Sequence, residues 1–213
     1  MPTYQETIAA IKATAASIQV ERIGEDGRIG SAMSEKPFLE ELKRRLPTTY
    51  QVDISPPRAA CDVMINGIRI NAKLTDCKTA DNAANKPSLF WSITGEQYPY
   101  SSNWNQFLEK LMAAKAAGKI KAERDPMTEY HYLAKNKTTG EVLLKSVFDI
   151  HTYVSNPSND LQINWGNEFA HADYVAPDYK NKVAELLGAI QRSVREMISR
   201  TQSFANAKFD ELL

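Results

Sequence analysis

The chain has 213 residues, of which 43% are hydrophobic and 24% are charged. This length suits one domain, and the composition excludes a disordered chain and a membrane protein. Lysine plus arginine number 26, and aspartate plus glutamate also number 26, so the formal net charge is zero. That balance excludes a surface coated in positive charge but allows a locally basic cleft, because attraction to nucleic acid depends on where the charges lie.

The start of the chain and its cysteine content both favour a cytoplasmic protein. The polar, acidic segment Met1–Glu6 is neither a signal peptide nor a transit peptide, and no apolar run approaches the roughly 20 residues of a membrane span. The two cysteines, Cys61 and Cys77, are too few to cross-link a domain of this size or to build a zinc site of four cysteines. We therefore expect a reducing compartment and no membrane association.

The first third of the chain predicts two helices. A capping box from Thr3 to Glu6 opens the first helix, and apolar residues follow at helical spacing as far as Ile18. A break at residues 24–27 separates it from the second helix. The second helix is expected to begin at Ser34, with Pro37 tolerated in its first turn, and to end before Pro47.

The middle of the chain predicts mostly strands. An alternating run covers residues 50–54, and two further runs, 58–65 and 68–75, flank Asn66-Gly67, which is the strongest short hairpin signal available. The apolar run 88–94 is predicted as a buried strand that ends at Gly95. Asn103 is expected to cap a helix that Gly118 ends, and residues 129–133 and 141–150 predict a second hairpin.

The last third predicts a polar, turn-rich segment at 156–167 and a long amphipathic helix over roughly 178–204. Taken with the preceding elements, this order predicts an α/β fold in which a central mixed β-sheet is flanked by helices. No internal repeat divides the chain, so we expect a single domain over residues 1–213.

The tight turn at residues 66 and 67 predicts which side chains share a face of the hairpin. Residues on opposite strands pair so that Asp62 faces Asn71 and Cys61 faces Ala72, with Lys73 two residues beyond Asn71 on the polar face. Directly opposed Cβ atoms lie about 5 Å apart. A carboxylate, an amide oxygen and an ammonium are therefore expected to converge, while Cys61 lies on the apolar face.

This cluster has the donors that metal-assisted phosphodiester hydrolysis requires. Asp62 and Asn71 offer oxygen ligands, which Mg²⁺ prefers. Lys73 could orient a water molecule or neutralise the charge that develops on the phosphorus centre. The alternative is a polar hairpin face without function, since aspartate, asparagine and lysine are common on such faces.

Asp62, followed nine positions later by Asn71-Ala72-Lys73, resembles the signature of the PD-(D/E)XK nucleases. The run Ile70–Thr75, the polar loop and then Leu89–Tyr98 are similar to the stretch after the catalytic hairpin in the EcoRV-like branch of the type II restriction endonucleases. The resemblance covers roughly residues 30–118. It implies a restriction-endonuclease-like fold and a Mg²⁺-dependent enzyme that cuts a short specific site in double-stranded DNA as a homodimer.

The resemblance also implies roles for individual residues. Asp62 and Asn71 would be catalytic residues that hold the metal, and Lys73 would lie near the attacking water and the scissile phosphate. Cys61 stands where the signature has proline, and Asn71 stands where the family usually has aspartate or glutamate. Either this branch tolerates asparagine, or another acid compensates for the missing charge, or the chain is inactive.

A compensating acid is available on the second predicted helix. Family members often add a glutamate from the helix before the hairpin, and Glu35 has the matching spacing to Phe38 and Leu42. Because Glu35 lies on the apolar stripe of this helix, it is expected to need a charged or metal partner. We predict Glu35 as a further catalytic residue and metal ligand, with Glu41 second. A first-turn glutamate favoured by the helix dipole is the alternative.

Two polar segments are candidates for contacting DNA. Lysine suits phosphate groups, and asparagine and glutamine suit base edges or phosphates. The loop at 76–87 and the segment at 156–167 supply the candidates, which are Lys78, Asn82, Asn85, Lys86, Asn159, Gln162 and Asn164. A solvated loop in the first case and ordinary turns in the second are the alternatives.

The sequence thus favours a type II restriction endonuclease. A repair or junction nuclease of the same fold would share the hairpin, and it would cut according to DNA structure instead of giving discrete bands from a plasmid. A catalytically inactive DNA-binding protein is the third possibility, and Asn71 is the residue that suggests it.

Overall fold

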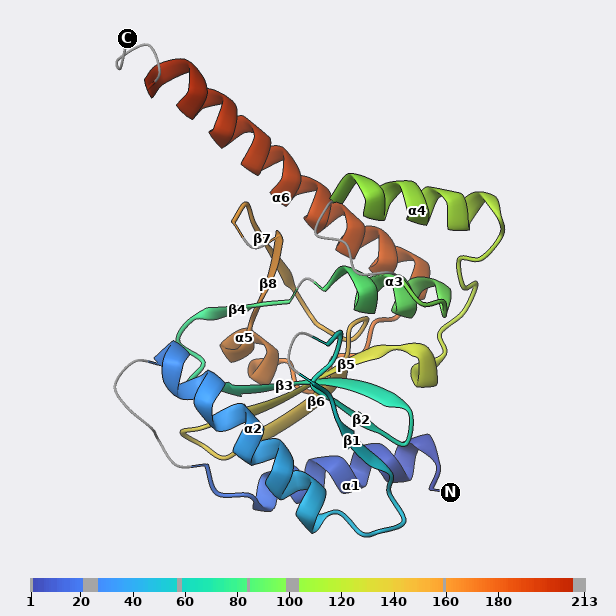
Figure 1. The fold of residues 1–213 in the computed structure, drawn as a ribbon, viewed down its shortest axis with the longest axis vertical. Coiled ribbons are helices and arrows are strands. Elements are labelled where there is room, and N and C mark those ends of the chain that lie inside the picture. The colour runs from blue at the N-terminus through green and yellow to red at the C-terminus, as the bar shows by residue number, and fades with distance from the viewer. Residues whose placement is uncertain are drawn as a thin grey trace.

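A five-stranded mixed sheet runs through the centre of the protein in this computed structural model, which describes residues 2–20, 27–56, 59–83, 85–98, 104–158 and 160–208 (Figure 1). Its strands, in spatial order, are β1 (Val52–Ile54), β2 (Val63–Ile65), β3 (Ile68–Thr75), β5 (Tyr130–Asn136) and β6 (Val142–Ser146). The central pair, β3 and β5, is parallel, and the other pairs are antiparallel. The predicted mixed sheet is therefore confirmed.

A second sheet, which the sequence did not predict, holds three short antiparallel strands. They are β4 (Ala80–Asn82), β8 (Asp160–Asn164) and β7 (Tyr153–Asn156), with β8 in the middle. Because β4 follows β3 along the chain after a few residues, the hairpin that carries the predicted site leads directly into this second sheet.

Helices cover both faces of the central sheet (Figure 1). Helices α1 (Tyr4–Ser17) and α2 (Gly27–Arg45) pack on one face, where their apolar side chains meet those of β2 and β3. The other face carries α3 (Lys86–Thr94), α4 (Trp104–Ala116) and the first half of α6 (Tyr179–Lys208), in one core with the second sheet. A short 3-10 turn, Pro126–Thr128, precedes β5, and α5 (Trp165–Ala170) follows β8.

Several predicted elements are confirmed. The capping box of α1 is present, with the Thr3 side chain accepting from the Glu6 amide and the Glu6 side chain accepting from the Thr3 amide. The second hairpin, β5–β6, and the long C-terminal helix also form. Within the described parts of the chain, none of the helices combines the length and the apolar character that crossing a bilayer requires.

The strand predicted at 88–94 is wrong, because this run is helix α3. Asn85 caps it by accepting a hydrogen bond from the Ser88 amide, Pro87 lies in its first turn, and Gly95 ends it with a left-handed φ of 76°. The apolar run gave no sign of a helix because α3 is buried on nearly all sides, between β5 and α4. A helix that is apolar all round shows no clear 3.6-residue period.

Three smaller predictions also need correction. Helix α2 begins at Gly27, before the predicted Ser34, and this places Pro37 inside the helix. Strand β6 ends at Ser146, and the rest of the predicted run to Ile150 is a buried turn. The turn-rich segment at 156–167 contains strand β8 and the start of α5. The predicted break at 24–26, the cap at Asn103, the hairpin start at Arg58 and the candidate Asn159 lie outside the described residues.

Candidate active site

The β2–β3 turn forms as the sequence predicts. Asn66 and Gly67 adopt φ values of 49° and 86°, which is the backbone of a two-residue hairpin turn that asparagine and glycine tolerate best. The Asn66 side chain accepts a hydrogen bond from the Gln51 amide at 2.8 Å and donates one to Thr7 Oγ1 at 3.1 Å. The turn is therefore anchored to both β1 and α1.

The register is confirmed from the turn to Val63, which pairs with Ile70. Beyond Val63 the prediction is wrong. The Asp62 amide also donates to the Ile70 carbonyl, at 2.9 Å, so two successive residues share one partner in the geometry of a β-bulge. Cys61 is consequently directed into the core that contains α3, and it does not lie on the apolar face shared by Val63 and Ala72.

The Asp62 carboxylate accounts for this bulge. Its Oδ2 accepts a hydrogen bond from the Ala72 amide at 2.8 Å. In the predicted register, the Cys61 carbonyl would have accepted the hydrogen bond from this amide. Asp62 therefore lies against the backbone of β3 between Asn71 and Lys73, and not simply opposite Asn71. This bond fixes the acid beside the two other residues of the motif.

Strand β3 separates its polar and apolar residues as predicted. Ile70, Ala72 and Leu74 are buried under α1 and α2, whereas Asn71 and Lys73 are half-buried on the other side of the strand. Lys73 Nζ lies 3.5 Å from Oε1 of Glu35, and each of these side chains is about a quarter exposed. The structure thus brings Glu35 of α2 to the same place as the motif residues of the hairpin.

The two acids of this cluster are poorly solvated. Burial raises the pKa of Glu35 above its ordinary value, while the nearby Lys73 ammonium acts in the opposite direction. Burial likewise raises the pKa of Asp62, against the hydrogen bond from the Ala72 amide and the charge of Lys73. Both carboxylates would therefore gain from a further positive charge.

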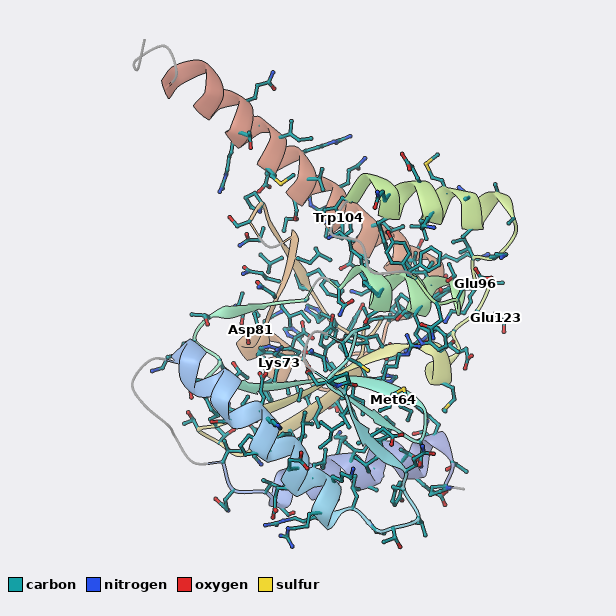
Figure 2. All side chains as sticks on the ribbon, in the orientation of Figure 1. Met64, Lys73, Asp81, Glu96, Trp104 and Glu123 are labelled. Atoms are coloured by element: carbon teal, nitrogen blue, oxygen red, sulfur yellow. The ribbon has the colours of Figure 1, made fainter. Side chains whose placement is uncertain are left out.

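Asp81 on β4 is a third acid in this neighbourhood, and sequence reasoning missed it. Its charge also raises the pKa of Glu35. Figure 2 shows Lys73 and Asp81 in the same region of the molecule, near the start of α2. The signal in the sequence is weak, since it is a single aspartate in a polar segment after the hairpin. Glu35 thus lies beside the ammonium of Lys73 and within reach of the charges of both Asp62 and Asp81.

The second-choice acid of the same helix, Glu41, lies elsewhere. Its carboxylate is bound by Arg44 at 2.6 Å and by Arg45 at 2.5 Å, at the C-terminal end of α2. The hydrogen bonds from these arginines lower the pKa of Glu41 to about 2. Glu41 is therefore engaged in a surface ion-pair cluster, and Glu35 is the acid of this helix that meets the hairpin.

The predicted DNA-binding residues differ in what their side chains contact. Asn85 and Asn164 cap α3 and α5, and Asn85 also donates to the Ala60 carbonyl, so their side chains hold the fold together locally. The Lys86 ammonium lies over the Trp104 ring, 4.1 Å from its centroid. By contrast, Lys78 is exposed on the loop after β3.

Two other predicted DNA-binding residues, Asn82 and Gln162, contact each other. They are partners in the β4–β8 pair, and Gln162 Nε2 donates to Asn82 Oδ1 at 3.3 Å. Asn82 is exposed and Gln162 is half-exposed. Two residues that are 80 positions apart in the chain thus share one surface.

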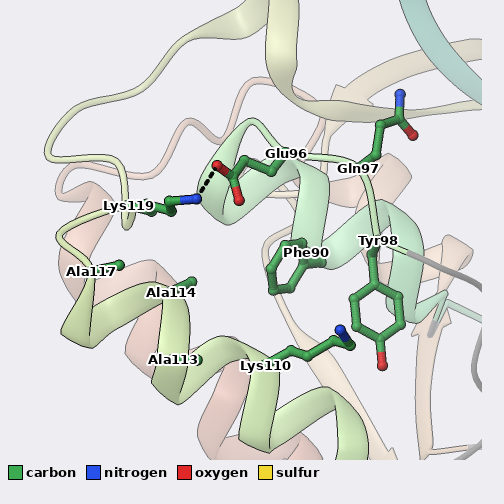
Figure 3. Close-up of a pocket in the computed structure, with 9 residues that line it drawn as sticks. All are labelled: Phe90, Glu96, Gln97, Tyr98, Lys110, Ala113, Ala114, Ala117 and Lys119. Atoms are coloured by element: carbon green, nitrogen blue, oxygen red, sulfur yellow. Dashed lines mark ion pairs between the residues drawn. The ribbon is translucent and has the colours of Figure 1, made fainter.

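A pocket of about 330 Å³ lies elsewhere, between α3 and α4 (Figure 3). Phe90 and Tyr98 form an aromatic wall, and an ion pair of 2.8 Å between Glu96 and Lys119 lies at one side. None of the predicted site residues lines this pocket. The predicted residues Glu35 and Lys73 meet away from this pocket, where α2 approaches β3.

The comparisons with known proteins add no family to this picture. No protein-family model matches the chain, and no curated protein matches it. The side chains that bear on function are therefore those of this chain's own hairpin and α2, above all Glu35, Asp62 and Lys73.

Proposed function

We propose that the protein is a Mg²⁺-dependent endonuclease that hydrolyses phosphodiester bonds in double-stranded DNA, with the fold and activity of a PD-(D/E)XK type II restriction endonuclease. One observation carries this proposal. The Lys73 ammonium lies 3.5 Å from the Glu35 carboxylate, on the strand whose backbone also holds Asp62. An ammonium beside poorly solvated carboxylates is the kind of group that phosphodiester hydrolysis uses.

The donor set fits a magnesium ion. Asp62 and Asn71 would supply a carboxylate and an amide oxygen, and Glu35 would supply a second carboxylate. Among the described residues, no three acidic, histidine or cysteine side chains are gathered closely enough to form a complete cage. A set of two or three protein oxygens suits Mg²⁺, because this ion usually keeps several water ligands. When bound, it would supply positive charge at the phosphate and lower the pKa of a coordinated water.

The chain's own residues have separable roles in this proposal. The Lys73 ammonium would orient the attacking water and balance the negative charge that grows on the phosphate oxygens. The water oxygen forms the new bond to phosphorus as the bond from phosphorus to the 3′ oxygen breaks. The attacking water releases one proton to the solvent, and the departing 3′ oxygen takes up one, so the products are a 5′-phosphate and a 3′-hydroxyl. The Ala72 amide would keep the Asp62 carboxylate directed at this centre.

The described part of the chain supplies one such cluster, so cutting both strands of a duplex at one site would call for two copies. We propose a homodimer on a palindromic sequence, because two-fold symmetry in the protein then matches two-fold symmetry in the DNA. Sedimentation of the protein with and without a duplex measures this directly, and a dimer of about twice 23.9 kDa is expected on DNA.

Plasmid cleavage in Mg²⁺ tests the proposed activity. Asp62→Ala removes a ligand, and Lys73→Ala removes the ammonium, so each is expected to slow cutting by roughly 10²–10³-fold or more. Asp53→Ala and Lys43→Ala serve as matched controls, because both residues are exposed and lie on β1 and on the outer side of α2. The controls are expected to cut at the rate of the unchanged protein.

The result also separates the roles of the two residues. If either Asp62→Ala or Lys73→Ala cuts at the normal rate, the role assigned to that residue is wrong. Thermal melting of each variant in EDTA accompanies the assay, because a variant that melts like the unchanged protein but does not cut has lost chemistry and not folding.

Asn71 favours a second candidate, a DNA-binding protein without catalysis. An amide oxygen can ligate a metal, but it lacks the charge that a carboxylate would bring. Asn71→Asp restores that charge without changing the size of the side chain. If cutting appears only in Asn71→Asp, the natural chain is an inactive binder. If the unchanged protein already cuts, Asn71 is a working ligand.

A further inference from the structure

The three-stranded sheet carries a row of amide side chains on one face. Along β8, Leu161 and Ile163 are buried, whereas Gln162 between them is half-exposed on the opposite face. The strand pairing places Asn82 of β4 on one side of Gln162 and Val154 of β7 on the other. Alternation along strands therefore presents these three side chains together on the outer face.

Hydrogen bonds fix this row in one orientation. Asn156 Nδ2 donates to Gln162 Oε1 at 3.0 Å, and Gln162 Nε2 donates to Asn82 Oδ1 at 3.3 Å. Asn156 is itself held, because its Oδ1 accepts from the Ser158 amide at 2.8 Å. Gln162 is thus held on both sides by side chains from the neighbouring strands, which removes much of the rotational freedom of its long side chain.

Gln162 keeps hydrogen-bonding capacity after these contacts. A primary amide has two N–H donors and two acceptor lone pairs, and these contacts engage one of each. The second donor and the second lone pair lie on the same planar group. A donor and an acceptor side by side match the N7 and N6 positions that adenine presents in the major groove.

Val154 supplies an apolar group directly beside this amide. It is the cross-strand partner of Gln162, and its side chain is 40% exposed. Within an A·T pair, the thymine C5-methyl group lies next to the adenine edge in the major groove, and exposed apolar side chains contact it. A fixed glutamine next to an exposed valine therefore matches both halves of one A·T pair.

The position of the sheet agrees with such a contact. β7 and β8 form an antiparallel ribbon beside α6 (Figure 1), and a two-stranded ribbon fits the major groove. Helix α6 is bound to β7 through the Ser193 hydroxyl, which accepts from the Asn156 amide at 3.0 Å, and the exposed Arg192 and Arg195 lie one and two positions from Ser193 in the chain. Arginines beside a base-reading element suit the flanking phosphates.

The same short strand connects this face to the candidate active site. Asn82 belongs to the amide row, and its neighbour Asp81 acts on the pKa of Glu35 from the other side of β4. We infer that Gln162, held between Asn82 and Asn156, reads an A·T base pair in the major groove, with Val154 against the thymine methyl group. This inference rests on the proposed function, because it takes double-stranded DNA as the substrate.

Selection of duplexes from a random pool tests the inference without any cutting. The protein is incubated with the pool in Ca²⁺, bound duplexes are recovered by gel shift, and their sequences are read. The unchanged protein is expected to enrich a motif with an A·T pair at a fixed position of each half-site. Gln162→Ala is expected to lose roughly ten-fold or more of the preference at that position and to keep the rest of the motif. Gln51→Ala, an exposed glutamine on the loop before β1, is the matched control.

A second arm uses modified DNA with the unchanged protein. Replacing thymine by uracil at the selected position removes only the C5-methyl group, and it is expected to weaken binding a few-fold. The same replacement is expected to leave the affinity of Val154→Ala unchanged, because that variant has already lost the contact.

The outcomes keep the inference and the proposed function apart. Selection of the full motif by Gln162→Ala, or of no motif by the unchanged protein, overturns the inference. Asp53→Ala, which changes an exposed acid on β1 outside the proposed active site, is expected to select the same motif as the unchanged protein. If a motif that depends on Gln162 is selected but Mg²⁺ supports no cutting, the reading role stands and the nuclease proposal fails.

Discussion

Glu35 holds its negative charge on α2 in a half-buried position, with the Lys73 ammonium 3.5 Å away. Burial raises the pKa of this carboxyl above 4.5, so the folded protein binds its proton more tightly than the unfolded chain does. Stability is therefore lost as the pH rises from the unfolded pKa through the folded one. Well below pH 4.5 both states are protonated, and this cost disappears.

Glu35→Gln is predicted to melt at a higher temperature than the unchanged protein at pH 7 in EDTA, because it removes the poorly solvated charge and keeps the shape. The difference is expected to shrink as the pH falls through the raised folded pKa toward about 4.5 and to vanish well below it, where glutamate is neutral in both states. Thermal melts across pH 3–7 measure it. A lower melting temperature for Glu35→Gln at pH 7 would show that the ion pair with Lys73 outweighs burial.

The same carboxylates give a prediction for activity. Asp62 and Glu35 both have raised pKa values from burial, and both must be ionised to hold a cation. Cutting is therefore expected to rise with pH over a range above the ordinary carboxyl values, and higher Mg²⁺ is expected to move this rise to lower pH because metal and proton compete. A rise whose position does not depend on Mg²⁺ would separate these acids from metal binding.

At the scale of single residues, the sequence predicted which residues form the motif, but not how their side chains are arranged. The positions of Asp62, Asn71 and Lys73 were evident from the hairpin turn, and Glu35 from its place on an apolar stripe. The bulge was not predictable, because it depends on the Asp62 side chain taking the amide of Ala72. The role of Asp81 was not predictable either, because it depends on how β4 folds back toward α2.

At the scale of elements, α3 is the instructive error. Its caps, Asn85 and Gly95, are present in the sequence, but the apolar run 88–94 has no visible periodicity and was predicted as a strand. Elements with two different faces, such as α1, β3 and α6, were predicted well, whereas of the predicted strand 58–65 only Val63–Ile65 forms a strand. Elements buried on all sides carry no periodic signal, so their type depends on caps and on tertiary packing.

Asn85→Ala is predicted to lower the free energy of unfolding by about 1–2 kcal/mol, since it removes the cap of α3 and the hydrogen bond to the Ala60 carbonyl. Urea denaturation followed by far-UV circular dichroism measures this loss. Asn85→Asp, which can still cap the helix but cannot donate to Ala60, is expected to lose less. If Asn85→Ala keeps its stability but binds DNA more weakly, Asn85 contacts DNA as the sequence predicted.

At the scale of the whole molecule, two apolar cores lie on opposite faces of the central sheet. One contains α1, α2 and the hairpin, and the other contains α3, α4, α6 and the second sheet. Strand β5 contributes side chains to both, because Leu133 lies in the first core and Tyr132 in the second. This shared strand predicts that both cores unfold together, as a single domain would.

The tryptophans allow a test of that prediction. Trp91, Trp104 and Trp165 all belong to helices on the side of the second core, so their fluorescence reports on that half, whereas far-UV circular dichroism reports on all helices and strands. The two signals are predicted to give coincident urea transitions. A circular dichroism transition that begins before the fluorescence transition would indicate two independently unfolding parts.

The central claim is that the cluster formed by Glu35, Asp62 and Lys73 belongs to a DNA-cutting enzyme. Its most direct test is a timed digest of a duplex of known sequence with the purified protein, in Mg²⁺ and in EDTA, with the ends of the products mapped to the nucleotide. We expect discrete fragments with 5′-phosphate and 3′-hydroxyl ends in Mg²⁺, and intact DNA in EDTA. Intact DNA at every Mg²⁺ concentration, from a protein that melts cooperatively, would show that this cluster does not cut DNA.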